Sequence, residues 1–221
     1  MTHRPVLTST SIVFLLATTL AGCEVTSKTT ERYEAEPQTE ELDYQSGTDL
    51  FIDARNGTIN VEPGESGVVR VTFTPFTYRG YDEDDQAQAE MENSLTTRAE
   101  LTDAGIEVAT LKEGGGSSSL GADIVVELPP EFDAGLFIDQ GNGDVDINTV
   151  GGEQFLDATR GELHLNSIGG EISVRGHAGK AVVKTASGDV TATGPLVSFD
   201  GSTVSGATIV DVTSGSPSLI A

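Results

Sequence analysis

The carboxylates with the chemistry to bind a metal ion recur at a fixed spacing in the second half of the chain. From residue 144 onward the sequence divides into units of nine, and the first place of five units is acidic. These residues are Asp144, Glu153, Glu162, Glu171 and Asp189. Carboxylate oxygens are the ligands that calcium prefers, and stacked acids repel one another unless a cation lies between them. The spacing therefore makes calcium binding a hypothesis for this region.

Two features of the same units favour a solvated acidic column instead. The stretch "GNGDVDIN" at residues 141–148 shares its glycines and Asp with a calcium-binding nonapeptide, but that repeat has one large apolar residue per unit and these units have two. The Asp after the second glycine does not recur, and Lys180 stands at the first place of another unit. The sequence therefore predicts exposed acids and no cofactor, with a calcium-stabilised β-roll as the alternative.

Catalytic patterns are nearly absent. Of the three histidines, His3 lies near the start, His164 is at an outward place of its unit and His177 is near a predicted corner. The sequence has no G-x-S-x-G elbow, and residues 176–180 lack the spacing and the Ser or Thr of a phosphate-binding loop. Two remaining histidines and one cysteine also argue against zinc. We therefore expect no enzyme activity.

The single cysteine has a different expected role. Weakly basic residues at the start are followed by the apolar run "SIVFLLATTLA", which is too short to span a membrane and suits a signal peptide. The next motif, "LAGC" at Leu20–Cys23, resembles the lipobox of bacterial lipoproteins, in which the peptide is cut before a cysteine that is then lipidated. Because Cys23 is the only cysteine, it has no disulfide partner within the chain. The motif predicts export and a lipid anchor such as palmitate at Cys23.

Composition limits the remaining choices. The 221 residues include 12 Lys and Arg against 35 Asp and Glu, which gives a formal net charge of −23. This charge repels nucleic acid and anionic surfaces, and it favours cations and basic partners. Aromatic residues make up only 5 %, there is no Trp, and Gly numbers 26. A repetitive β structure packed with aliphatic side chains fits this composition.

The nine-residue units indicate how such a structure is built. The ninth place is Gly in seven of eight units, with Val197 as the exception, and the second and fourth places are mostly apolar. Side chains alternate along a strand, so the second and fourth places point to one side, and Gly permits a tight corner afterwards. We therefore predict an all-β fold containing a single-stranded β-solenoid or β-roll-like domain with 18-residue coils. A sandwich of antiparallel hairpins is the alternative.

The coil arrangement makes a specific prediction about the interior. Ile147, Leu165 and Val183 are expected in one column of stacked residues, and Leu156 and Val174 in the facing column. The strand at 162–165 is then parallel to those at 144–147 and 180–183. In the hairpin alternative it is antiparallel to the strand at 171–174.

Four regions follow from this reading. Residues 1–22 are a lipoprotein signal peptide, 23–46 a polar tether, 47–132 an N-terminal β region, and 133–221 the glycine-punctuated repeat. In the N-terminal region, Asn56-Gly57 predicts a turn, and Pro129-Pro130 closes a predicted strand. The acidic stretch at 82–85 starts either a short helix or an exposed loop.

Two stretches carry a resemblance to a known family. The chain from "ADIVVELPPEF" through "NGDVDI" to "SGDVTATG" resembles the "putative adhesin" family of bacterial envelope proteins, the DUF4097-like group, which is akin to the head-GIN-domain proteins. "FIDARNGTINVEPGE" is similar to the opening strand pair of that family, so the resemblance covers about residues 48–215. It implies an all-β, solenoid-like domain that is exported or membrane-attached, and it brings no catalytic residue.

The sequence as a whole predicts a lipid-anchored cell-envelope protein with a binding, adhesion-like or structural role. Its expected partners are the membrane, through the lipid anchor, and envelope proteins or glycans; nucleic acid is excluded by charge. Whether the anchor lies in an inner or an outer membrane stays open. A β-helix enzyme acting on polysaccharide is the least favoured alternative, because the repeat loops are too short to build the walls of a groove.

Overall fold

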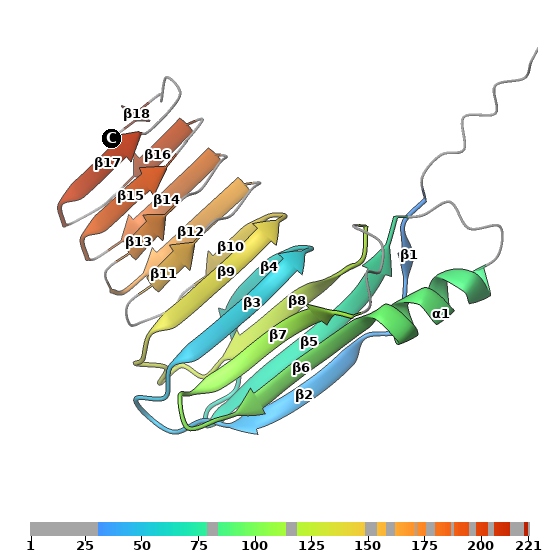
Figure 1. Cartoon of the computed structure of the whole chain (residues 1–221). Helices are drawn as coiled ribbons and strands as arrows, with labels where there is room; N and C mark the ends of the chain where they lie inside the picture. Colours follow the sequence, from blue (N-terminus) through green and yellow to red (C-terminus); the bar gives the residue numbers. More distant parts are fainter. Residues whose placement is uncertain are drawn as a thin grey trace, which may run out of the picture.

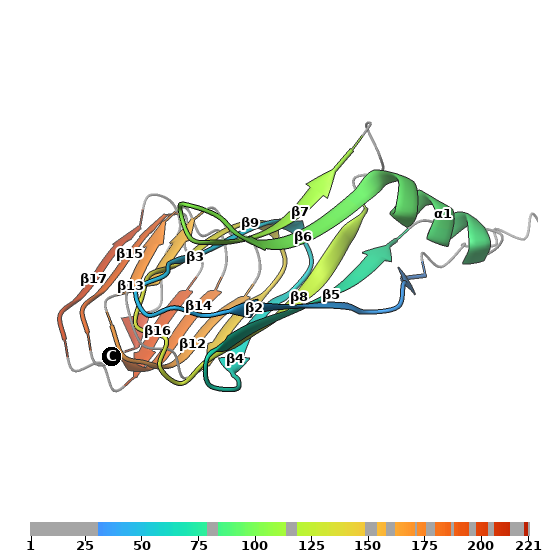
Figure 2. The ribbon, with the colours of Figure 1, turned by 90° about the horizontal axis from the view of Figure 1, so that it is seen from below.

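The computed structural model describes residues 31–78, 84–113, 119–148, 154–157, 162–170, 172–175, 180–186, 188–194, 198–202, 206–212 and 219–220. In these ranges the chain forms two mixed β-sheets that pack face to face, with one helix, α1 (Asp84–Ser94), at the end opposite the repeat strands (Figures 1 and 2). The helix resolves the alternative left open for residues 82–85, and its first turn carries Asp84 and Asp85. Acidic residues are favourable there because a helix N-terminus carries partial positive charge.

The eight-stranded sheet has the order β17-β15-β13-β11-β9-β3-β7-β6. Its strands are β3 (Leu50–Asn56), β6 (Leu95–Leu101), β7 (Ile106–Lys112), β9 (Leu136–Asn142), β11 (Gln154–Asp157), β13 (Ile172–Arg175), β15 (Val190–Gly194) and β17 (Thr208–Val212). All neighbours in this sheet are parallel except β6 and β7, which form an antiparallel hairpin at one end.

The ten-stranded sheet has the order β1-β5-β8-β4-β10-β12-β14-β16-β18, and β2 also pairs with β5. Its strands are β1 (Tyr33–Glu34), β2 (Gln38–Asp43), β4 (Ile59–Pro63), β5 (Val68–Thr77), β8 (Gly121–Leu128), β10 (Val145–Asn148), β12 (Glu162–Ile168), β14 (Lys180–Ala186), β16 (Ser198–Ser202) and β18 (Leu219–Ile220). Strand β5 is antiparallel to β1, β2 and β8, and the other pairs are parallel.

The predicted pairing within the repeat is confirmed. Leu165 is opposite Ile147 on one side and opposite Val183 on the other, and both pairs are parallel. Leu156 is opposite Val174 in the other sheet. Strands β12 and β13 lie in different sheets, so the antiparallel pairing of the hairpin alternative does not occur. Each repeat strand from β9 to β17 therefore pairs with strands 18 residues away, as the nine-residue period requires, and only the final pair, β16 and β18, is 20 residues apart.

The predicted fold class is nevertheless wrong in its architecture. The chain does not form a single-stranded β-solenoid or β-roll-like domain beside an N-terminal β region, but two open, mixed sheets that both run through the two regions. Strand β3 pairs with β9, and β4 pairs with β10. The antiparallel strands at one end, including β1 and β2 from segment 23–46, have no 18-residue partners. Their positions are therefore not encoded by the repeat spacing.

The core lies between the two sheets (Figure 2). Because side chains alternate across a strand, every second residue of each sheet points inward. These residues are each at most 2 % exposed: Leu50, Ile52, Leu136, Ile138, Ile172 and Val174 from one sheet, and Ile59, Val61, Ile124, Val126, Val145, Ile147, Leu163 and Leu165 from the other. They are aliphatic, as the composition predicted, and they form one continuous cluster.

Glycine is required where the chain crosses between the sheets. The predicted turn at Asn56-Gly57 connects β3 to β4, which lie in different sheets, and Gly143 makes the equivalent corner between β9 and β10. Their φ angles are +124° and +133°, a region that side chains disfavour. A Cβ on Gly143 would also lie 1.8 Å from the carbonyl oxygen of Gly57. The corners of neighbouring rungs therefore approach so closely that only glycine fits.

A carboxylate after β8 fastens the turn before β3. Asp133 accepts hydrogen bonds from Ser46 Oγ at 2.7 Å, from the Gly47 N–H at 2.8 Å and from Tyr44 Oη at 2.7 Å. These donors, with Ser46 contributing most, lower the pKa of Asp133 to about 2. Strand β8 itself ends at Leu128, immediately before Pro129, as the sequence predicted.

The stacked interior yields the first prediction. Leu165→Ala is expected to lower the free energy of unfolding by roughly 2–5 kcal/mol, because it removes buried methyl groups and leaves a cavity. Leu101→Ala is the matched control: that leucine is 52 % exposed in β6, so the same change should cost about 0.5 kcal/mol or less. Urea denaturation of both variants measures the difference. Similar losses for the two would contradict the placement of Leu165 in the core.

Candidate functional site

The structure describes three of the five acids predicted as weak metal candidates, Asp144, Glu162 and Asp189, and all three are exposed. An Asp144 oxygen accepts a hydrogen bond from the backbone N–H of Glu162 at 2.7 Å. Asp189 does the same for the backbone N–H of Ala207, again at 2.7 Å. Each bond connects one rung of a sheet to the next, 18 residues later. The Asp that follows a corner glycine thus has a structural use that needs no metal.

Most of the other residues singled out in the sequence are not described by the structure. Cys23, Glu153, Glu171, His3 and His177 lie outside the described residues. Within the described ranges, no three His, Cys, Asp or Glu side chains are grouped so as to hold a metal ion.

His164 is described, and it lies on the outer face of the ten-stranded sheet between two carboxylates. Its Nδ1 is 3.0 Å from Asp146 Oδ1, and its Nε2 is 3.2 Å from Glu162 Oε2. The imidazole is thus positioned by the neighbouring rung and by its own strand. This is consistent with the outward place that the repeat assigned to it.

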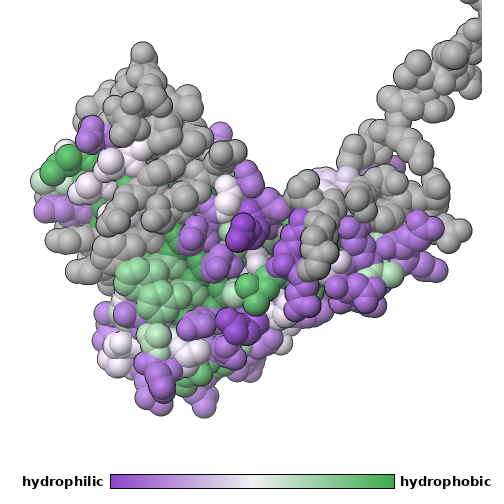
Figure 3. Space-filling model, in the orientation of Figure 1, coloured by the Kyte–Doolittle hydropathy of each residue, from purple (hydrophilic) through white to green (hydrophobic). Residues whose placement is uncertain are grey.

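The main surface feature is a hollow that the sequence reasoning missed. It has a volume of about 700 Å³ and lies on the outer face of the eight-stranded sheet, lined by residues of β3, β6, β7, β9 and β13. Strand β7 pairs with β3 from Ile106 to Ala109, and in Figure 2 the end of β7 beyond this pairing rises away from β3. Figure 3 shows hydrophobic side chains gathered over β3 and β9, with hydrophilic ones around them. The floor of the hollow is therefore apolar and its rim is polar.

Two rows of side chains line the hollow. Phe51 is opposite Phe137 in the register, and Asp53 is opposite Asp139. The two rings stack with their centroids 4.8 Å apart and their planes at 14°. The register continues to Phe155 and Asp157 in β11. We name the first pair, Phe51 and Phe137, the phenyl row, and the second pair, Asp53 and Asp139, the carboxylate row.

The β6–β7 hairpin forms the side of the hollow next to β3. Glu107 of β7 is opposite Phe51, and Leu111 near the end of β7 is 41 % exposed. Arg98 of β6 forms ion pairs with Glu107 at 3.4 Å and with Glu100 at 2.9 Å. The described lining contains one basic residue, Arg98, and three acidic ones, Asp53, Glu107 and Asp139, so its formal charge is 1 − 3 = −2. The hollow therefore combines an apolar floor with an excess of negative charge.

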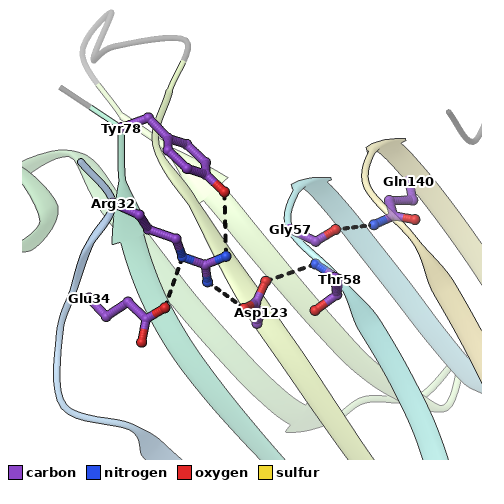
Figure 4. Close-up of polar contacts among 7 residues, drawn as sticks. All are labelled: Arg32, Glu34, Gly57, Thr58, Tyr78, Asp123 and Gln140. Carbon is purple, nitrogen blue, oxygen red and sulfur yellow. Dashed lines mark hydrogen bonds and ion pairs between the residues drawn. The ribbon is translucent and has the colours of Figure 1, made fainter. Parts of the chain in front are cut away.

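A second cavity has a volume of about 290 Å³, and polar side chains that line it bond to other groups of the chain (Figure 4). Arg32 lies over the ring of Phe76, 4.0 Å from its centroid, and its Nε is 2.9 Å from Glu34. The same guanidinium forms an ion pair with Asp123 and donates a 3.4 Å hydrogen bond to Tyr78 Oη. Because its donors are already used by the protein, Arg32 fastens the beginning of the described chain to β5 and β8.

A signal for the hollow is present in the sequence. "LFIDARNG" at residues 50–57 and "LFIDQGNG" at residues 136–143 share six of eight residues, and "FLD" at 155–157 repeats their centre. The nine-residue units begin at residue 144, so the first two of these segments lie outside them. Aligning them places Phe with Phe and Asp with Asp, which is the register that the two rows show.

Comparisons with solved structures find remote similarity. A "putative cell adhesion protein" from Clostridium sporogenes matches 83 % of this chain and 99 % of its own, with a TM-score of 0.44 and 11 % identity. A "putative adhesin" from Bacteroides fragilis matches 84 % of this chain and 97 % of its own, with a TM-score of 0.32 and 9 % identity. A "putative lipid binding protein" from Parabacteroides distasonis covers the same shares, with a TM-score of 0.21 and 9 % identity. Similarity at this level transfers no residue and no role.

No protein-family model matches the chain, and no curated protein matches it. In the part of the chain that the structure describes, no helix has the length and apolar character to cross a membrane.

The rung-to-rung hydrogen bonds yield the second prediction. Asp189→Ala should lower the free energy of unfolding by about 1 kcal/mol, because the Ala207 N–H loses its acceptor. Asp189→Asn should recover most of this loss, since an amide oxygen also accepts. Thermal melts with and without calcium measure both effects. If Asn and Ala are equally damaging, and calcium raises the melting temperature of the wild type alone, the acid is a metal ligand instead.

Proposed function

We propose that this chain is a lipid-anchored, non-catalytic binding protein of the bacterial cell envelope, and that it binds its partner in the hollow over β3, β7 and β9. The observation that carries the proposal is the apolar floor of this hollow, made by the stacked rings of Phe51 and Phe137. Its volume of about 700 Å³ is within the range typical of binding sites. Exposed apolar patches with a polar rim commonly mark such sites.

The side chains around the hollow support binding rather than catalysis. The described lining contains no His, Cys or Lys, and its one hydroxyl belongs to Ser173. A nucleophile needs an adjacent base to be activated. The carboxylates of the described lining belong to β3, β7 and β9, whereas Ser173 belongs to β13. A wall built from paired strands is also rigid, which favours recognition of a fixed shape.

The position of the hollow suits an anchored protein. If Cys23 carries the lipid, eight residues, 24–31, separate it from Arg32, and the distance from Cys23 to Arg32 is at most about 30 Å when this segment is extended. Arg32 then holds the chain against the end of the sheets that carries β1 and α1 (Figure 1). The repeat strands extend away from that end, so the hollow lies between the anchored end and the free end of the molecule.

The anchor is tested by fractionation of cells that produce the full chain. Cys23→Ala should move the protein from the membrane fraction to the soluble fraction and abolish labelling by a fatty-acid probe. One acyl chain binds a membrane only marginally, so several chains on the cysteine are expected in the wild type. Asp189→Ala, far from the anchor, is the control and should remain in the membrane fraction. Retention and labelling of the cysteine variant would contradict the anchor.

The binding surface is tested with the mature protein immobilised on beads and incubated with a bacterial envelope extract. The double variant Phe51→Ala/Phe137→Ala should lose about tenfold or more of the material that the wild type captures, because the apolar floor is removed. Thr191→Ala/Ile209→Ala is the matched control, since these exposed residues occupy the far end of the same outer row. Melting curves for both variants exclude unfolding. Unchanged capture by the phenylalanine variant would show that the hollow is not the binding surface.

A further inference from the structure

We infer that the partner is an extended segment of a basic protein, in which apolar and basic side chains alternate along one face. This inference rests on the proposed binding role of the hollow, and it identifies the chemistry of the occupant. It is carried by the arrangement of the phenyl row and the carboxylate row, together with the charge around them.

The spacing of the rows matches an extended chain. Phe51 and Asp53 are two residues apart on β3, as are Phe137 and Asp139 on β9. Residues two apart on a strand point to the same face and are separated by about 6.6–6.8 Å. A peptide lying extended along the strands has this same spacing between its residues i and i+2. An apolar side chain over the phenyl row therefore places the next same-face side chain over the carboxylate row.

The phenyl row favours aliphatic side chains over sugar rings. A sugar packs on an aromatic ring through an open face, but Phe51 and Phe137 use one face each on the other. Phe51 also packs closely against Gly105, the residue before β7, because a Cβ on Gly105 would lie 3.1 Å from the Phe51 ring. What remains toward the hollow is the ring edges, which carry partial positive charge and contact aliphatic groups through dispersion. Exposed Leu111 extends this apolar surface on the hairpin side.

The charge of the hollow selects the basic component. Asp53 and Asp139 are both exposed and lie one rung apart, so their carboxylates repel each other. The single basic residue of the described lining, Arg98, is engaged by Glu107 and Glu100 on the hairpin side. A Lys or Arg side chain above the carboxylate row is attracted by this concentration of negative charge. The net charge of −23 adds long-range attraction for a basic partner and repels acidic ones.

The test uses synthetic fluorescent nonapeptides and the folded mature protein. In the first peptide, Leu and Lys alternate at the odd positions and Ser fills the even ones. In the second peptide Glu replaces Lys, and in the third Gly replaces Leu. Fluorescence anisotropy should show that the Leu-Lys peptide binds about tenfold more tightly than either of the others, because each lacks one of the two complementary rows.

Variants separate the hollow from general charge attraction. Asp53→Asn/Asp139→Asn should weaken the Leu-Lys peptide about tenfold, with a reduced dependence on salt. Glu36→Gln/Glu40→Gln removes the same charge from exposed residues near and in β2, and it should change the affinity by less than about threefold. Equal weakening by the two pairs would overturn the inference, since the attraction would then be non-specific.

The outcomes also separate this inference from the proposed function. A neutral β-linked glucose hexasaccharide is titrated in parallel. If it binds in a manner that depends on Phe51 and Phe137 while the Leu-Lys peptide does not, the hollow is a binding site for glycan and the inference of a basic peptide is overturned. If the phenylalanine variant captures envelope material as well as the wild type does, the proposed function itself fails.

Discussion

The in-register, parallel pairing of strands is the constraint on which the rest of the molecule depends. It places each residue beside the equivalent residue of the neighbouring rung, as Leu165 lies beside Ile147. A slip of one residue would turn every inward side chain outward, so a core of aliphatic rows fixes the register strongly. The corners obey the same constraint, because Gly143 must pass within contact distance of Gly57. Sequence repetition is therefore a physical requirement of the stack.

The same pairing builds the outer face, but with an opposite energetic effect. Stacked phenylalanines attract each other, so the phenyl row stabilises the sheet. The carboxylate row places two like charges on adjacent strands, and like charges repel. Such a concentration of one charge on an exposed face favours a partner of the opposite charge. At the corners the acids are different: Asp144 and Asp189 accept backbone hydrogen bonds and so contribute to stability.

The sequence was most informative where structure repeats locally. The apolar second and fourth places of each unit predicted the buried rows, and the glycines predicted the corners, because both follow from side-chain alternation and backbone sterics. It was least informative about pairs such as Phe51 and Phe137, which are 86 residues apart in the sequence and adjacent in the sheet. Nothing in the spacing of the repeat indicates where β5, β6 and β7 attach. The three described acids at unit starts, Asp144, Glu162 and Asp189, are exposed as predicted, but a carboxylate that accepts backbone hydrogen bonds and one that binds a metal have the same sequence pattern.

The hollow exists because the regular stack ends. Parallel strands follow one another from β17 to β7, and a further parallel strand would extend the same flat face. Instead β6 returns antiparallel to β7, and the end of β7 beyond Ala109 rises away from β3 (Figure 2). Glu107 still lies beside Phe51 in the register, but Leu111 lies beyond the last β3–β7 pair, and both residues line the hollow. The repeat thus supplies the rows, and the break in the repeat supplies the wall, so a surface with both regular spacing and depth arises only at this junction.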